Sequence, residues 1–282
     1  MRIALGQLVS GFDLNDNIQT ILRLMDEAAQ SKTEYVFFPE NALSMHSVKL
    51  FEIGQNLLNP NSALTKIQTQ CQKLQIGVVL GSVPIPEESI SDPERPQRVR
   101  AATLVYDAQG VLICRYDKIH LFDAQVEDSQ GKYVESNYIA PGCQPTICQL
   151  NGLNFGLSIC YDLRFPELFR QLRLAGAHVL VVPAAFTEHT GRAHWEVLLR
   201  ARAIENQCYV LGIDQGGNHS PQRRTFGHTM VVDPWGEVVK SIELGEGLVI
   251  ADLNLERVLK IRQQMPIMSH RYESLPSPVQ YP

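Results

Sequence analysis

The sequence predicts an α/β protein folded as a four-layer α-β-β-α sandwich, with two packed sheets between outer helices. Short apolar runs typical of buried strands alternate with amphipathic stretches along the 282-residue chain. Two pairs of similar segments relate the two halves: Tyr35–Pro39 resembles Val179–Pro183, and Leu104–Gly110 resembles Met230–Gly236. Each half therefore supplies one sheet, and the two sheets bury their apolar faces by packing on each other.

The first half contains a regular succession of candidate strands and helices. The residues from Asn15 to Gln30 place apolar side chains at helical spacing. Pro39 ends the apolar run Tyr35–Phe38 that directly precedes it. We expect helices at Asn15–Gln30 and Ser62–Leu74, and strands at Ile3–Leu8, Tyr35–Phe38, Ile76–Val83, Ala101–Tyr106 and Val111–Tyr116. The polar, proline-containing stretch from Pro84 to Arg100 is expected to be a surface excursion.

The second half repeats this plan. Pro166 suits the first turn of a helix. We expect helices at Pro166–Ala175 and Ala193–Glu205, and strands at Phe155–Cys160, Val179–Val182, Tyr209–Asp214, Thr229–Val232 and Val238–Ile242. Because no linker separates the halves, residues 1–262 are expected to form one domain. Residues 263–282, which contain four prolines, are expected to form an extended C-terminal arm.

Composition excludes several classes of partner. The chain has 25 Lys and Arg against 30 Asp and Glu, a net charge of −5 that offers no basic surplus for nucleic acid or an anionic membrane. Its longest apolar run, Val179–Phe186, is too short to span a bilayer. Six cysteines without a Cys-x-x-Cys pair, and an N-terminus without an apolar signal segment, predict a cytoplasmic protein with reduced thiols. No phosphate loop, dinucleotide fingerprint or zinc motif is present, so we expect neither cofactor nor metal.

Cys160 is a candidate nucleophile because of its position. It closes an expected strand and precedes an expected helix, where α/β sheets bind ligands. Helix amides and a nearby cation can lower a thiol pKa at such a place. The alternative is that Cys160 only packs in the core, as free cysteines often do.

Three charged residues add to this hypothesis. Glu40 and Lys118 each follow an expected strand, and Glu135 lies in a loop before Pro141 and Gly142. Taken singly, each is explained as a solubilising strand end or loop residue. Together with Cys160 they provide a thiol, a cation and two carboxylates, the groups needed for acyl transfer.

Three motifs that contain these residues resemble the signatures of the nitrilase superfamily of carbon–nitrogen hydrolases. They are Phe38–Glu40, Tyr116–Phe122 and Cys160–Glu167, in the same order and spacing as in that family. The resemblance covers nearly the whole chain, from Ile3 to Tyr272. It implies the four-layer sandwich, cofactor-free hydrolysis through a cysteine thioester, and a homodimer or higher homo-oligomer.

The resemblance also implies catalytic roles. Cys160 would be the nucleophile and Glu40 its general base, while Lys118 and the backbone N–H of Tyr161 would form the oxyanion hole. Glu135 would be the second glutamate; its rival is Glu127 in the same loop. A catalytically idle scaffold of the same fold is the alternative, but the four intact groups count against it.

The segments Thr190–Glu205 and Phe226–Gly236 resemble the amidase branch of this superfamily, which contains deaminated glutathione amidase and ω-amidase. Glu135–Tyr138 and Asp214–His219 are most similar to the deaminated glutathione amidases of this branch, which implies deaminated glutathione as the small-molecule amide substrate. The alternative is a smaller 2-oxo acid amide that releases ammonia. A 2-oxo acid carboxylate needs a cation, and the guanidinium of Arg164 can supply one. Phe186 and Thr190 match pocket positions of the family. Their alternatives are a local pair between Arg164 and Glu167 and a core position for Phe186.

Overall fold

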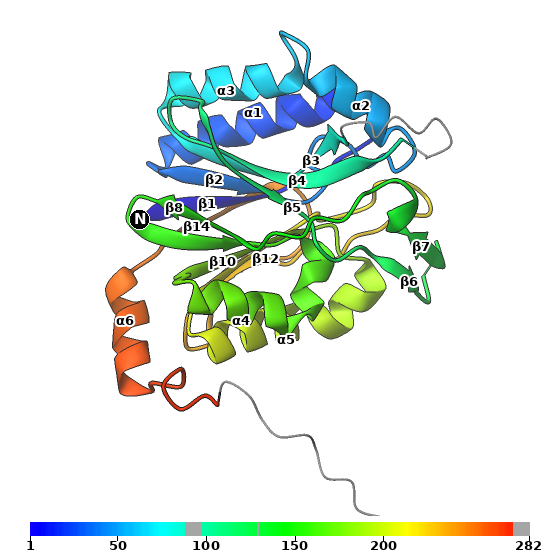
Figure 1. The fold of residues 1–282 in the computed structure, drawn as a ribbon. Helices are drawn as coiled ribbons and strands as arrows, with labels where there is room; N and C mark the ends of the chain where they lie inside the picture. Colours follow the sequence, from blue (N-terminus) through cyan, green and yellow to red (C-terminus); the bar gives the residue numbers. More distant parts are fainter. Residues whose placement is uncertain (88–96, 129, 273–282) are drawn as a thin grey trace, which may run out of the picture.

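The structure is a computed structural model that describes residues 1–87, 97–128 and 130–272. Within these ranges the strands form two six-stranded sheets that pack face to face, together with a small two-stranded sheet. Helices α1 and α3 cover the outer face of one large sheet, and α4 and α5 cover the outer face of the other (Figure 1). The predicted four-layer α-β-β-α sandwich is therefore confirmed.

The first sheet has the strand order β14-β1-β2-β3-β4-β5. Strands β1, β2 and β3 are parallel, whereas β4 and β5 return as antiparallel neighbours, so β5 runs in the same direction as β2. The carboxyl ends of β2 and β5 consequently lie at one edge of the sheet. The strands are β1 (Arg2–Gln7), β2 (Tyr35–Phe38), β3 (Gly77–Pro86), β4 (Val99–Tyr106), β5 (Leu112–Asp117) and β14 (Gly247–Asp252).

The second sheet repeats this arrangement with the order β13-β12-β11-β10-β9-β8. Strands β9, β10 and β11 are parallel, and β8, β12 and β13 join antiparallel at the two sides. The strands are β8 (Thr146–Leu150), β9 (Leu153–Leu157), β10 (Val179–Ala184), β11 (Tyr209–Asp214), β12 (Thr229–Val232) and β13 (Val238–Ile242).

The two sequence matches between the halves occupy equivalent places in the sheets. The first pair lies on β2 and β10, each the middle one of three parallel strands, and the second pair forms the β4–β5 and β12–β13 hairpins. In the hairpin turns, the backbone oxygen of Asp107 accepts a hydrogen bond from the N–H of Gly110, and the backbone oxygen of Asp233 accepts one from the N–H of Gly236. Both glycines have positive φ (71° and 91°), as such turns require. The repeat is therefore structural.

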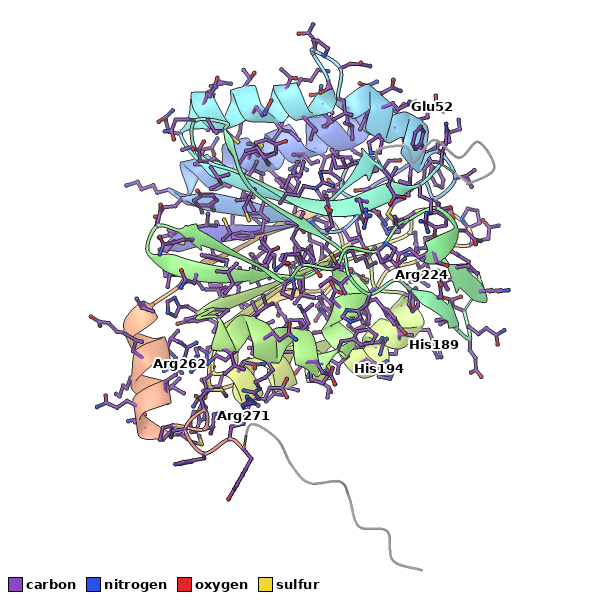
Figure 2. All side chains as sticks on the ribbon, viewed as in Figure 1. Glu52, His189, His194, Arg224, Arg262 and Arg271 are labelled. Carbon is purple, nitrogen blue, oxygen red and sulfur yellow. The ribbon has the colours of Figure 1, made fainter. Side chains whose placement is uncertain are left out.

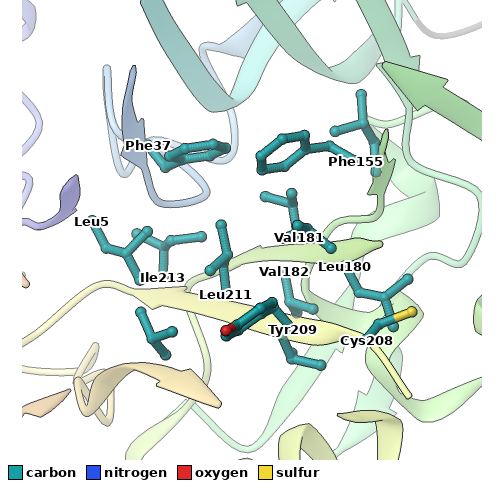
Figure 3. Close-up of a cluster of buried hydrophobic side chains, with 14 of the residues drawn as sticks. Leu5, Phe37, Phe155, Leu180, Val181, Val182, Cys208, Tyr209, Leu211 and Ile213 are labelled. Carbon is teal, nitrogen blue, oxygen red and sulfur yellow. The ribbon is translucent and has the colours of Figure 1, made fainter. Parts of the chain in front are cut away.

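Strands β1 to β4 of the first sheet are buried on both faces. Odd-numbered residues such as Leu5 and Phe37 face the second sheet, where the ring of Phe37 stacks on Phe155 at 5.7 Å (Figure 3). Even-numbered residues such as Val36 and Phe38 pack beneath α1 and α3. This two-sided burial explains why the strands read as continuous apolar runs in the sequence.

The helices begin and end at recognisable caps. The Asp13 side chain accepts from the first N–H groups of α1, Ser62 caps α3, and Thr187 caps α5. The helices are α1 (Leu14–Gln30), α2 (Leu50–Leu57), α3 (Ala63–Leu74), α4 (Pro166–Leu174), α5 (Glu188–Asn206) and α6 (Leu255–Gln264). In the described ranges no helix has the length and apolar character that a bilayer crossing needs.

Several elements differ from the sequence expectations. The sequence did not predict α2, α6, β8, β14 or the small β6–β7 hairpin (Asp123–Gln125 and Lys132–Val134). Helix α5 begins at Glu188, five residues earlier than expected, because Thr187 provides the cap. The expected excursion at 84–100 begins within β3 and ends within β4, and its residues 88–96 lie outside the described ranges.

The C-terminal region begins with a docked helix. Arg262 of α6 donates to the backbone oxygens of Ala177 and Gln207, which attaches α6 to the ends of α4 and α5 (Figure 2). Because α6 continues to Gln264, the helix extends two residues past the expected domain end at 262. The expected arm over 263–282 lies outside the described ranges from residue 273 onward.

Candidate active site

Glu40, Lys118, Glu135 and Cys160 line one cavity of about 230 Å³. All four residues are buried, and Lys118 is only 1% exposed. The sequence-predicted group is thus brought together from four separate segments. Burial of so many ionisable groups is costly unless they pair, so their mutual contacts decide what the site can do.

The strand directions explain the convergence. Glu40 follows β2 and Lys118 follows β5, whose carboxyl ends share one edge of the first sheet. Glu135 opens a short 3-10 helix (Glu135–Asn137) directly after β7. Cys160 comes from the second sheet, three residues after β9 ends at Leu157. The site therefore lies where the two sheets meet.

Lys118 joins the two glutamates. Its Nζ lies 2.8 Å from Glu40 Oε1, and 2.8 and 2.9 Å from the two carboxylate oxygens of Glu135. Burial alone would lower the pKa of the Lys118 amine, but the carboxylates of Glu135 and Glu40 raise it well above its ordinary value. Lys118 is therefore a permanent cation in this site.

Both glutamates are also held by backbone amides. Glu40 Oε2 accepts from the N–H of Ala185 at 3.0 Å, and Glu135 Oε2 accepts from the N–H of Phe122 at 2.6 Å. Burial raises the pKa of Glu135, against the opposing effect of Lys118. The backbone oxygen of Glu40 accepts from Gln215 Nε2 at 3.0 Å. Each carboxylate thus has a fixed orientation, with Lys118 between the two.

Cys160 does not end the strand as expected. Strand β9 stops at Leu157, and Cys160 begins a 3-10 helix (Cys160–Arg164) with φ at +49°. This left-handed conformation is uncommon for a non-glycine residue and is typical of functional turns. The turn lifts the thiol out of the sheet and into the cavity.

The expectation that the Cys160 thiol has a lowered pKa is wrong. Burial, and next the negative charge of Glu40, raise the thiol pKa well above its ordinary value, and Lys118 opposes them only in part. The thiol is consequently protonated at neutral pH. A base must therefore take the thiol proton when Cys160 reacts. Glu40 is the candidate base, because a hydrogen bond to Glu40 is one of the causes that raise the pKa of the thiol.

Asp162 positions this turn, and the sequence reasoning missed it. Its carboxylate accepts from Tyr116 Oη at 2.6 Å, from Ile159 N at 2.8 Å and from His120 N at 3.0 Å, and it lies 2.7 Å from His120 Nδ1. The side chain is fully buried. Asp162 therefore ties the Cys160 turn to the segment that carries Lys118, and its place two residues after Cys160 was the available signal.

Glu135 and its rival Glu127 have different surroundings. Glu135 is buried and contacts Lys118, whereas Glu127 lies exposed on the loop after β6 and does not line the cavity. Of the two acids, Glu135 is the one that contacts Lys118.

The four expected substrate-binding residues all line the cavity. The Arg164 guanidinium lies 5.2 Å from the Phe186 ring and 5.8 Å from the Tyr161 ring, and it contacts His194 at 3.3 Å instead of pairing with Glu167. Thr190 lies in the first turn of α5, where its hydroxyl is 2.8 Å from that of Thr187.

The cavity also contains residues that sequence reasoning did not single out. Arg223 lies on the loop between β11 and β12, and its Nη2 donates to the backbone oxygen of Ala185 at 3.0 Å. Its guanidinium lies 5.1 Å from the ring of Tyr133, another cavity residue. No motif marked this arginine, because its neighbours in the sequence are ordinary loop residues.

Comparison with known proteins places the chain in a family. The family model for carbon–nitrogen hydrolases matches residues 2–263, so the chain belongs to the carbon–nitrogen hydrolase family.

Among its relatives, a deaminated glutathione amidase from Yersinia enterocolitica is 38% identical over 268 residues, which cover 95% of this chain and 92% of that protein. The crystal structure of the NitFhit protein of C. elegans superposes with a TM-score of 0.86 at 36% identity over 96% of this chain, which spans 64% of that protein. Saccharomyces cerevisiae Nit3, a member of branch 10 of the nitrilase superfamily, superposes with a TM-score of 0.81 at 28% identity, with 96% and 97% of the two chains covered.

Proposed function

We propose that this protein hydrolyses a linear amide through a thioester on Cys160. The observation that carries the proposal is the contact of one buried ammonium, Lys118, with two buried carboxylates beside a buried thiol. This arrangement is too costly for a merely structural role when a hydrophobic cluster could fill the same volume. The proposal agrees with the membership of the chain in the carbon–nitrogen hydrolase family.

In the first half of the reaction, Cys160 Sγ attacks the amide carbonyl and its proton passes to Glu40. The negative oxygen of the tetrahedral intermediate accepts from Lys118 Nζ and from the N–H of Tyr161. An ammonium has three N–H donors, which face Glu40 Oε1 and the two oxygens of Glu135, so the contact with one Glu135 oxygen gives way to the bond to the negative oxygen. The C–N bond then breaks, Glu40 returns the proton to the leaving nitrogen, and a thioester remains.

In the second half, water attacks the thioester carbonyl as Glu40 accepts a proton from it. The C–S bond breaks, the acid is released, and the sulfur regains its proton from Glu40. Glu135 acts throughout by fixing Lys118, since both of its oxygens lie within 2.9 Å of Nζ. Glu135 is therefore a positioning residue in this mechanism.

We propose deaminated glutathione as the substrate, cleaved to 2-oxoglutarate and cysteinylglycine. Relatives that match over more than nine-tenths of this chain, from Yersinia enterocolitica and Synechocystis, are named deaminated glutathione amidases. The guanidinium of Arg164 in the cavity wall suits the carboxylate of the 2-oxo acid end. The competing substrates are smaller 2-oxo acid amides that release ammonia.

The test is turnover of deaminated glutathione, 2-oxoglutaramate and 2-oxosuccinamate by the wild type and by Cys160→Ala. We expect release of the 2-oxo acid from deaminated glutathione with the highest kcat/KM, and none with the variant at unchanged melting temperature. Rapid quenching and intact-mass measurement should detect the acyl group on the wild type alone. Turnover by Cys160→Ala would exclude the thioester mechanism. A preference for 2-oxoglutaramate would exclude deaminated glutathione as the substrate but leave the mechanism in place.

We further infer that the protein forms a homodimer or higher oligomer through the face that contains α5. Val197 and Ile204 of this helix are exposed (67% and 52%), as is Trp235 of the neighbouring turn (52%). Adjoining exposed apolar side chains of this kind favour a subunit contact. Light scattering after size exclusion should give a multiple of 31.7 kDa, and Val197→Glu should reduce that mass to one chain.

A further inference from the structure

The cavity wall contains two guanidinium groups, those of Arg164 and Arg223. In the described part of the chain neither has a carboxylate partner: Arg164 contacts His194, and Arg223 contacts the backbone oxygen of Ala185. Lys118, by contrast, already pairs with two carboxylates, those of Glu40 and Glu135. The cavity thus offers two positive charges to a ligand, one more than the carboxylate of a 2-oxo acid requires.

The two arginines come from different segments of the chain and pack on different aromatic rings. Arg164 follows the Cys160 turn and packs against the rings of Tyr161 and Phe186. Arg223 comes from the β11–β12 loop and packs against Tyr133, which lies on β7. Because their contacts are separate, they can engage two different groups of one ligand.

The Arg223 guanidinium is fixed but not saturated. Its Nη2 donates to Ala185, and the ring of Tyr133 supports the plane, which leaves several of its five N–H donors for a ligand. Its backbone N–H donates to Ser220 Oγ at 3.1 Å, which orders the loop around it. Ser220 and Gln222 of this loop also line the cavity and add neutral polar groups beside the cation. A planar cation held in this way suits a carboxylate, which it can bind with two parallel hydrogen bonds.

We propose that Arg223 forms a second carboxylate subsite, which binds the leaving-group end of the substrate. The site would then select amides with a carboxylate at each end: Arg164 binds the 2-oxo acid end, and Arg223 binds the terminal carboxylate of the departing amine. This inference rests on the proposed function. It explains a preference for deaminated glutathione, whose leaving group ends in a glycine carboxylate, over 2-oxoglutaramate, whose leaving group is ammonia.

The experiment compares deaminated glutathione with its analogue in which the glycine carboxylate is a carboxamide. For Arg223→Gln, kcat/KM on the free acid should fall about 10- to 100-fold more than on the carboxamide, the cost of losing a charge-assisted hydrogen bond. The loss should lie mainly in KM, because the interaction is made before the chemical step. The wild type should itself prefer the free acid by a similar factor.

Arg224→Gln is the matched control. Arg224 is adjacent in sequence, but its side chain is 56% exposed and pairs with Glu188 outside the cavity. It should leave the ratio between the two substrates at the wild-type value.

If Arg223 only supports the structure, through Ala185 and hence Glu40, Arg223→Gln would lower kcat/KM equally for both substrates. That result would overturn the proposed subsite. An equal wild-type rate on both substrates would overturn it too. Failure of the wild type to cleave either substrate would instead overturn the proposed function.

Discussion

Lys118 and Glu40 are 78 positions apart in the chain, yet Lys118 Nζ lies 2.8 Å from Glu40 Oε1 in a buried site. The pair connects the carboxyl ends of two strands in one sheet, and Glu135 adds a second carboxylate on the other side of the ammonium. One cation between two acids leaves Glu40 bound to the cation while it lines the same cavity as the thiol of Cys160. A carboxylate in this position can take the proton of the thiol without losing its own orientation.

Removal of the central cation should therefore affect both stability and rate. Lys118→Met leaves two carboxylates buried without a cation, and breaking such a buried ion pair costs about 3–5 kcal/mol. The loss of an oxyanion donor should lower kcat by about 10²- to 10³-fold. Urea denaturation and steady-state kinetics on the same preparation measure the two effects.

The double variant Lys118→Met with Glu135→Gln separates stability from catalysis. It removes one buried charge, so it should recover part of the lost stability while kcat stays low. Recovery of kcat along with stability would mean that Lys118 acts only in folding.

The reactivity of the thiol should depend on Glu40 in a defined direction. Burial and then the charge of Glu40 raise the pKa of Cys160, so alkylation by iodoacetamide in the wild type should still increase as the pH rises past 9.0, the ordinary value. Glu40→Gln removes the charge and should move the midpoint of the alkylation profile to lower pH. Its amide oxygen can still accept from Ala185, so the fold is kept.

The same variant should nevertheless be a poor enzyme, because glutamine cannot accept a proton. We expect kcat to fall about 10²- to 10⁴-fold, the usual contribution of a general base. A profile that moves to higher pH, or a variant with the wild-type kcat, would argue against Glu40 as the base.

Much of this site could be predicted from sequence because its residues stand next to strong strand signals. Glu40 follows an apolar run that ends in proline, and Cys160 precedes the Pro166 helix start. The exact end of β9 could not be predicted, because the left-handed turn at Cys160 is held by bonds from Asp162 to Tyr116 and His120, which are 46 and 42 positions away. The elements missed, such as β14 and α6, are stabilised by contacts with distant segments: β14 pairs with β1, and α6 is attached through Arg262.

Arg223 was missed for a related reason. Its role depends on Tyr133 and Ala185, which lie 90 and 38 positions away, so a local motif carries no signal of it. Glu127 and Glu135 could not be ranked by spacing alone either, since only the path of the β6–β7 hairpin decides which of them is buried.

Arg164 should contribute to binding through the shape of its guanidinium. Arg164→Lys keeps the charge but loses the planar fork and the packing on Phe186 and Tyr161. We expect KM for 2-oxo acid amides to rise about tenfold with a smaller change in kcat, as for a lost charge-assisted bond. Glu167→Gln is the control, because Glu167 does not pair with Arg164, and it should leave KM unaltered. An unchanged KM for Arg164→Lys would remove this residue from the pocket.

Asp214 provides a test of pH-dependent stability at the edge of the site. Its Oδ1 accepts from the N–H of Phe186 at 2.8 Å, whereas its Oδ2 is buried without a partner in the described residues. Burial raises the pKa of Asp214 well above its ordinary value of 3.8, so the native state keeps a proton that the unfolded state loses. Because the native state binds more protons, this group lowers the free energy of unfolding as the pH rises above about 4.

Asp214→Asn preserves the acceptor for Phe186 and cannot ionise. The free energy of unfolding of the wild type, minus that of the variant, should therefore decrease from pH 5 to pH 8, by at most about 1.4 kcal/mol for each pH unit. Urea titrations of both proteins at each pH give this difference directly. A constant or rising difference would mean that Asp214 is already ionised in the folded protein.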